Sequence, residues 1–253
     1  MKAFALLCVL VQIMSNEGAP QLIIPYYSYM TPDSPAVQNM ILASKSFSVT
    51  VVIKPDVISN PDGNWTASVA ALASSGISIL GYTTMLYGAR TVNDVLADID
   101  SYNTWPNASK INGIYLDQAS NEFSYVEDYK IIYQYVRSKF SCKSKTFLST
   151  GTNVDPSFFH IDEKNRTADT VVIFEDDYKN WNTFDFAPFY SNLASSELCA
   201  IIYSCTKQDM VQVIETAAKN NIGFIYVTDR QMNNPFDSLP TYYDDLILYL
   251  ATN

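Results

Sequence analysis

Eight short apolar runs, rich in β-branched and aromatic residues, recur along the chain and alternate with amphipathic stretches. The runs span residues 22–29, 49–55, 77–84, 111–117, 145–151, 170–175, 198–204 and 222–228. Near-continuous apolar runs of this length are typical of strands buried on both faces, as in parallel sheets. The stretches 93–102, 125–140 and 207–219 carry apolar residues at helical spacing.

A strand–helix unit repeated about eight times predicts a closed α/β fold, the (β/α)8 TIM-type barrel. We expect one barrel domain over residues 20–253, because no Pro-, Ser- or Gly-rich linker divides the chain. An open, doubly wound sheet is the alternative. It is less well supported, since no Gly-x-Gly-x-x-Gly pattern or phosphate loop follows the first predicted strand.

The N-terminus resembles a secretory signal peptide, for which we predict the range 1–19. Lys2 precedes an apolar stretch that ends at Met14, and the small residues Gly18 and Ala19 follow. Asn64, Asn107 and Asn165 each begin an N-glycosylation triplet. The sequence therefore predicts a secreted or extracellular glycoprotein, with attachment to the cell surface as an alternative. We expect no membrane insertion, because no segment reaches about 18 uncharged apolar residues.

The composition argues against a nucleic-acid partner and is compatible with a carbohydrate partner. A formal net charge of -10 disfavours binding to a nucleic-acid backbone, which requires Lys and Arg. The 18 Tyr, 13 Phe and 3 Trp supply flat rings that pack in cores or stack on sugar faces. We expect a polysaccharide or glycan partner and no nucleic acid, and the sequence leaves the oligomeric state undefined.

Removal of the signal peptide would leave three cysteines, Cys142, Cys199 and Cys205. Cys199 and Cys205 flank one predicted strand, whose length of about 20 Å is beyond disulfide reach. A Cys142–Cys199 bond is the expected pair, because both precede strands. No Cys/His cluster has metal-ligand spacing and His160 is the only histidine, so we expect neither a metal nor another cofactor.

The predicted strands end in polar and aromatic residues, which a (β/α)8 barrel would gather at one mouth. Asp117 and Glu175 directly follow two buried runs, where a carboxylate must be paired or open to a cleft. Two carboxyl groups facing one glycosidic bond are sufficient for hydrolysis, so both are candidate catalytic residues. The alternative is that they cap loops or pair with Arg90 and Arg230.

Seven further residues are candidates for binding the substrate around this pair. They follow the predicted strands or lie in the adjacent loops: Tyr26, Tyr82, Arg90, Gln118, Trp181, Tyr203 and Asp229. Arg90 could orient a carboxylate or anchor its loop by a salt bridge. Trp181 follows the sixth strand closely enough to form the floor of a sugar site.

Several motifs resemble those of the spherulation-specific family four, also called the spherulin-four family. They are NPDG (60–63), LGYTT (80–84), YGAR (87–90), GIYLD (113–117), VIFE (172–175), YVTD (226–229) and NPFDSLPTYY (234–243). Each motif is short, but their order and spacing cover nearly the whole predicted mature chain.

That family resembles glycoside hydrolase family 135, which implies a (β/α)8 barrel and endo-acting hydrolysis of α-1,4-linked N-acetylgalactosamine. The resemblance places the family's Asp-Glu pair at Asp117 and Gln118, and its further Glu at Glu175. The second acid is therefore an amide in this chain, and Gln118 cannot donate a catalytic proton. Ser149 and Tyr203 also depart from the family pattern, where Asn and His are usual.

Three functions remain open at this level. The first is a secreted glycosidase acting on an amino-sugar polysaccharide through Asp117 and Glu175. The second is a catalytically inactive glycan-binding protein, in which Gln118 replaces an obligatory acid. The third, implied only by the family name, is an encystment-associated structural protein.

Overall fold

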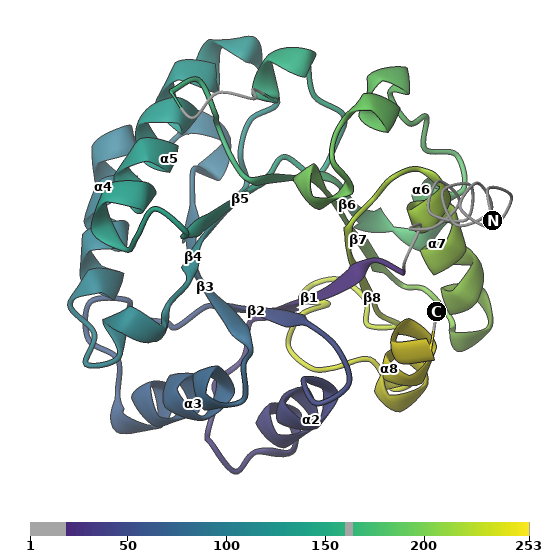
Figure 1. Cartoon of the computed structure of the whole chain (residues 1–253), viewed down its shortest axis with the longest axis horizontal. Coiled ribbons are helices and arrows are strands. Elements are labelled where there is room, and N and C mark those ends of the chain that lie inside the picture. The colour runs from purple at the N-terminus through teal and green to yellow at the C-terminus, as the bar shows by residue number, and fades with distance from the viewer. Residues whose placement is uncertain (1–18, 160–163, 253) are drawn as a thin grey trace, which may run out of the picture.

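A computed structural model describes residues 19–159 and 164–252, and it confirms the closed barrel (Figure 1). Eight parallel strands pair in sequence order, and β1 pairs with β8 to close the ring. The strands are β1 (Gln21–Tyr26), β2 (Val49–Ile53), β3 (Ser78–Thr84), β4 (Gly113–Asp117), β5 (Lys145–Ser149), β6 (Thr170–Asp177), β7 (Leu198–Tyr203) and β8 (Phe224–Val227).

Helices surround the barrel, and Figure 1 shows them as an outer ring around the central strands. They are α2 (Pro35–Ala43), α3 (Gly63–Ser74), α4 (Val92–Asn103), α5 (Val126–Lys139), α6 (Tyr178–Trp181), α7 (Lys207–Lys219) and α8 (Tyr243–Thr252). Short 3-10 turns lie in the loops: η1 (Leu86–Gly88), η2 (Ala108–Lys110), η3 (Phe123–Tyr125), η4 (Pro156–Phe158), η5 (Pro188–Asn192) and η6 (Ser195–Glu197).

Each predicted strand overlaps one strand of the barrel, and the differences lie at the ends. The first predicted run continues to residue 29, whereas β1 ends at Tyr26. The reason is a change of partner, since the backbone amide of Tyr27 donates to the carbonyl of Phe236 and leaves the β1–β2 ladder. The aromatic residues after β1 therefore belong to a loop.

Local capping explains where two of the outer helices begin. Asp62 accepts hydrogen bonds from the backbone amides of Asn64 and Trp65 and so caps α3. Thr91 and Asp94 form a reciprocal capping box at the start of α4. Both caps satisfy amides that the first helical turn leaves without partners.

A one-residue bulge in β6 determines which side chains face the barrel interior. Val172 pairs with Cys199, but the next pair is Phe174 with Ala200, so the register shifts at Ile173. Strand side chains alternate between faces, and the shift turns Phe174 outward and Glu175 inward. Consistent with this, the Phe174 ring packs on Trp181 at a centroid distance of 5.0 Å.

The expected Cys142–Cys199 disulfide is wrong, because both thiols are free and Cys205 is free as well. Cys142 is exposed in the turn before β5, whereas Cys199 is completely buried within β7. Strand β6 lies between β5 and β7 in the barrel, so a shared end of the barrel does not bring these two residues together.

Three other expectations concern membranes, metals and the chain terminus. Among the described residues, no helix is long and apolar enough to cross a bilayer. The same residues hold no group of three or more His, Cys, Asp or Glu side chains placed to bind a metal ion. The predicted signal peptide and His160 lie outside the described residues.

Candidate active site

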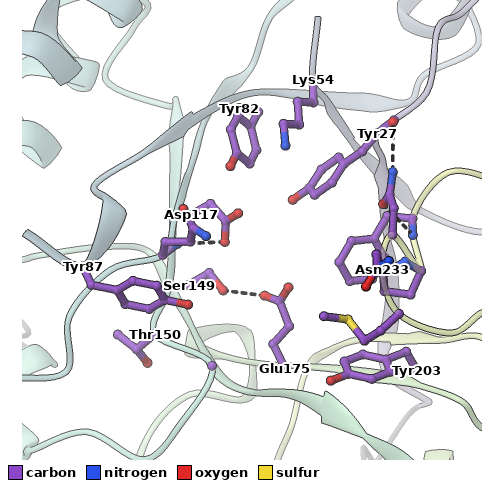
Figure 2. Close-up of a pocket in the computed structure, with 16 residues that line it drawn as sticks. Tyr27, Lys54, Tyr82, Tyr87, Asp117, Ser149, Thr150, Glu175, Tyr203 and Asn233 are labelled. Atoms are coloured by element: carbon purple, nitrogen blue, oxygen red, sulfur yellow. Dashed lines mark hydrogen bonds between the residues drawn. The ribbon is translucent and has the colours of Figure 1, made fainter. Parts of the chain in front are cut away.

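A pocket of about 620 Å³ opens at the carboxyl ends of the strands (Figure 2). This volume is in the range of ordinary small-molecule sites. Most strands contribute side chains to its wall, and the loop after β8 forms one side. The lining residues are Tyr27, Lys54, Tyr82, Tyr87, Asp117, Gln118, Ser149, Thr150, Gly151, Glu175, Tyr203, Met232, Asn233, Asn234, Pro235 and Phe236.

Asp117 is the last residue of β4, and its carboxyl group projects into the pocket (Figure 2). Its Oδ1 accepts a hydrogen bond of 2.8 Å from the backbone amide of Gln118. Burial raises the pKa of Asp117 above its ordinary value, while the Gln118 amide, the Tyr82 hydroxyl and the Lys54 ammonium oppose that increase. Three groups therefore favour the ionised form of this carboxyl.

Glu175 projects into the same pocket from β6 (Figure 2). Its Oε2 accepts hydrogen bonds from the Ser149 hydroxyl at 2.7 Å and the Tyr115 hydroxyl at 3.2 Å. Burial, and next the negative charge of Asp117, raise the pKa of Glu175 to about 7. The two hydroxyl donors lower that pKa only in part.

The two carboxyl groups line one pocket but have unlike surroundings. Asp117 has a cation and a backbone amide to stabilise its charge, whereas Glu175 has only two neutral hydroxyl groups. As the pH falls, Glu175 is therefore the first of the two carboxyl groups to take up a proton. One protonated and one ionised carboxyl around a pocket is the arrangement that acid–base chemistry requires.

Gln118 lies beside Asp117 with a left-handed backbone, at φ 48°. Its Oε1 accepts a hydrogen bond of 2.9 Å from the Thr84 hydroxyl. With the carbonyl end held by Thr84, the amide nitrogen is the end that can donate to a ligand. Gln118 thus contributes a neutral hydrogen-bond donor to the pocket.

The loop after β3 brings Tyr87 to the pocket edge, where the residue is 65 % exposed. Leu86 and Tyr87 both have positive φ, at 45° and 55°, and non-glycine residues in this region carry strain that surrounding contacts must hold. The backbone amides of Met85 and Tyr87 donate to the carbonyls of Asp117 and Gln118. The loop is therefore braced directly against the candidate catalytic strand.

Arg90 does not line the pocket. Its guanidinium pairs with Asp98 of α4 at 2.7 Å and donates to the carbonyls of Thr84 and Asp94. The loop-anchoring alternative is the one that the structure bears out. The interpretation of Arg90 as a partner of Asp117 or Glu175 is wrong, because its charge is paired with Asp98 of the adjacent helix α4.

Tyr26 and Trp181 are also absent from the pocket wall. Tyr26 is buried on the outer face of β1, because the alternation that turns Tyr27 inward turns its neighbour outward. Trp181 is 2 % exposed and packs on Phe174, outside the barrel. Its place in an apolar cluster with Phe184 and Phe186 excludes it from the floor of the pocket.

Asp229 is outside the pocket wall too, and it accepts hydrogen bonds from the amide and hydroxyl of Thr241. It therefore fixes the loop that leads to α8. Arg230, the other proposed carboxylate partner, donates to the carbonyl of Leu239. Tyr203 does line the pocket, and its hydroxyl donates to Asp176 at 3.0 Å.

Tyr27 and Lys54 both line the pocket, although neither was among the candidate site residues. The Tyr27 hydroxyl is buried, and no hydrogen-bond partner for it exists among the described residues. The signal for Lys54 was present, since a lysine directly after the apolar strand VTVVI occupies the strand end that faces the mouth. The alternation of β1 would likewise have favoured Tyr27 over Tyr26.

Fold and pocket together define the class: a (β/α)8-barrel protein with two carboxyl groups at the carboxyl-terminal ends of the strands. The model of spherulation-specific family 4 matches residues 21–250, and the chain belongs to this family. Spherulin-4 of Physarum polycephalum is 30 % identical over 234 residues, which cover 87 % of this chain and 66 % of that protein. The chain thus spans just under two thirds of the length of that relative.

A solved structure confirms the fold at lower sequence similarity. The crystal structure of Aspergillus clavatus Sph3 in complex with GalNAc has a TM-score of 0.77 to this chain. The match covers 93 % of this chain and 98 % of the Sph3 chain, at 20 % identity. The two proteins share the barrel over almost their full lengths.

Proposed function

We propose that this protein is an extracellular glycoside hydrolase that cleaves a polysaccharide containing N-acetylated amino sugars. Asp117 and Glu175 are its two catalytic carboxyl groups. The observation that carries the proposal is the unlike environment of this pair, which favours a protonated Glu175 and an ionised Asp117 at one pocket.

The reaction follows from these two protonation states. Glu175 donates its proton to the glycosidic oxygen as the bond to the anomeric carbon breaks. The Asp117 carboxylate stabilises the positive charge that develops on the sugar ring. Water then adds its hydroxyl to the anomeric carbon and returns a proton to the carboxylate pair, which restores the starting state.

An amino-sugar substrate is supported by the pocket and by the structural relative. The Gln118 amide can donate to an acetamido carbonyl, and Tyr87 and Tyr203 offer rings at the pocket edge for sugar faces. Sph3, which shares the fold, was solved in complex with GalNAc. We therefore assign N-acetylgalactosamine as the preferred sugar.

An extracellular location is supported by the signal-like N-terminus and the glycosylation triplets. Asn64 and Asn165 are exposed, and Asn107 is half-buried with its amide donating to the carbonyl of Thr66. Secretion of the full chain from a eukaryotic host, with the mature N-terminus near residue 20, is the expected result.

The test is incubation of the purified protein with N-acetylgalactosamine polymers, followed by mass spectrometry of released oligosaccharides. We expect products from the natural sequence. Glu175→Gln and Asp117→Asn should each lower turnover by about 10²- to 10⁴-fold, the usual contribution of a catalytic acid or base. Glu122→Gln is the matched control, because Glu122 is exposed and does not line the pocket.

A glycan-binding protein without turnover is the second candidate, and Gln118 is the observation that favours it. If Gln118 occupies the place of an obligatory acid, the natural sequence should bind the polymer and release nothing. Products that form only after Gln118→Glu would then identify a binding protein. Turnover that survives in both Glu175→Gln and Asp117→Asn would contradict the assignment of these two carboxyl groups as catalytic.

A further inference from the structure

Lys54 lines the pocket but is not explained by the reaction described above. It directly follows β2, and the next residue, Pro55, restricts its backbone to extended conformations. The strand alternation therefore continues through Lys54 and turns its side chain inward, two residues after Val52. Figure 2 shows its amine pointing between Tyr27 and Tyr82 toward the pocket.

Two aromatic faces hold the Lys54 ammonium in place. Its Nζ lies 4.6 Å from the ring centroid of Tyr82 and 4.9 Å from that of Tyr27. These cation–π contacts position the charge without neutralising it. Among the described residues that line the pocket, Lys54 is the only cationic side chain.

Apart from Lys54, the groups around Asp117 and Glu175 are neutral or acidic. Besides the two carboxyl groups themselves, they are Tyr27 after β1, Tyr82 on β3, Tyr87 in η1, Tyr115 on β4, Ser149 on β5, and Cys199 and Tyr203 on β7. The charge of Lys54 lowers the pKa of Asp117, whereas the groups that lower the pKa of Glu175 are the neutral hydroxyls of Ser149 and Tyr115. The single positive charge thus acts unequally on the two carboxyl groups.

We propose that Lys54 is a positioning residue that keeps the negative charge on Asp117 and so directs the shared proton to Glu175. Tyr27 and Tyr82 hold its ammonium on the Asp117 side of the pocket. The inference rests on the proposed function for the roles of the two carboxyl groups. The distribution of the proton is measurable whether or not the protein turns over a substrate.

The experiment is an NMR pH titration of the full chain labelled with ¹³C at Asp and Glu carboxyl carbons, with Asp117 assigned by Asp117→Asn. In Lys54→Met the titration midpoint of Asp117 should rise by roughly half a unit to one unit, since a partly exposed charge is screened by solvent. Lys54→Arg should retain the natural midpoint. Lys143→Met, which removes an exposed lysine from the turn before β5, should leave it unchanged.

A salt titration of the natural sequence tests the same charge without any substitution. Raising the ionic strength to about 1 M should move the Asp117 midpoint toward that of Lys54→Met. If the protein is active, kcat/KM of Lys54→Met should be about three- to tenfold lower than that of the natural sequence at pH values below the acidic midpoint. The difference between the two proteins should be smaller at the pH optimum.

An Asp117 midpoint that stays in place in Lys54→Met and at high salt would overturn the inference. An equal shift in Lys54→Met and Lys54→Arg would overturn it as well, because shape and not charge would then be responsible. Absence of turnover in the natural sequence, with the Asp117 shift intact, would instead contradict only the hydrolase.

Discussion

The protonation of Glu175 is set by a few contacts inside the barrel mouth. Its carboxyl group accepts from Ser149 and Tyr115, but burial and Asp117 outweigh these donors and raise its pKa to about 7. A carboxyl held in this way is protonated in the native protein and ionised in the unfolded chain between about pH 4.5 and pH 7. This difference links the site to stability.

Stability should therefore depend on pH through Glu175. Because its folded pKa is raised, its contribution is fully present below the unfolded value and is lost as the pH rises through about 7. Between about pH 4.5 and pH 8, the natural protein should lose on the order of 2 kcal/mol of unfolding free energy relative to Glu175→Gln. Urea denaturation of both proteins at both pH values measures this loss. The natural protein should show no such loss relative to the control variant Glu122→Gln.

The hydroxyl of Ser149 should lower the pKa of Glu175. Ser149→Ala removes the 2.7 Å hydrogen bond to Glu175, which favours the ionised form, so the pKa of Glu175 should rise further. The alkaline limb of the kcat/KM profile should then move up by up to about one unit. Ser149→Thr keeps the hydroxyl and should restore the natural profile. If the alkaline limb does not move in Ser149→Ala, this limb does not report the ionisation of Glu175.

Elements of the barrel position these residues through the pairing of neighbouring strands. The bulge in β6 is the sharpest case, since without it the alternation from Val172 would turn Glu175 toward the helices. The loop after β3 acts in a similar way. Its amides bond to the carbonyls of Asp117 and Gln118, and the Arg90–Asp98 pair holds its far end.

The contact between β4 and β5 allows no side chain at Gly113. A Cβ there would lie 1.8 Å from the carbonyl oxygen of Lys145, so Gly113→Ala must separate the two strands. We expect the unfolding free energy to fall by about 3 kcal/mol or more, as measured by urea denaturation. Gly63→Ala is the control, because nothing lies within 4 Å of its Cβ position.

The control should change stability by less than about 0.5 kcal/mol, as for other exposed substitutions. A Gly113→Ala protein as stable as the natural sequence would show that β4 and β5 can move apart freely. In that case the position of Asp117, at the end of β4, would not depend on the close strand contact.

The whole molecule is held by a continuous core and not by disulfides within the described residues. Side chains fill the barrel and the layer between strands and helices, and Phe147 and Phe224 meet inside the barrel at a centroid distance of 5.0 Å. Cys199 and Cys205 are part of this core as free thiols. Burial raises the pKa of both thiols.

The reactivity of each thiol should follow its exposure to solvent. Of the three described cysteines, Cys142 should react with a thiol reagent in the native protein, and Cys199 and Cys205 only after unfolding. Absorbance assays before and after denaturation measure the two steps. Cys142→Ser should abolish the native reaction, whereas its persistence in that variant would show that the barrel opens to the reagent.

Much of this architecture was available from the sequence because it depends on local patterns. Apolar runs defined the eight strands, helical spacing placed α4, α5 and α7, and position after a strand placed Asp117 and Glu175 near the mouth. Family motifs led to the same fold, which the matched family and the Sph3 structure confirm.

What the sequence did not determine depends on contacts between segments far apart in the chain. The β6 bulge that turns Glu175 inward arises from pairing with β7, and the ion pair that removes Arg90 from the site arises from its packing on α4. Tyr27, Lys54 and the loop after β8 meet only when the barrel closes. Periodicity defines which residues form strands, but register and closure decide which side chains share the pocket.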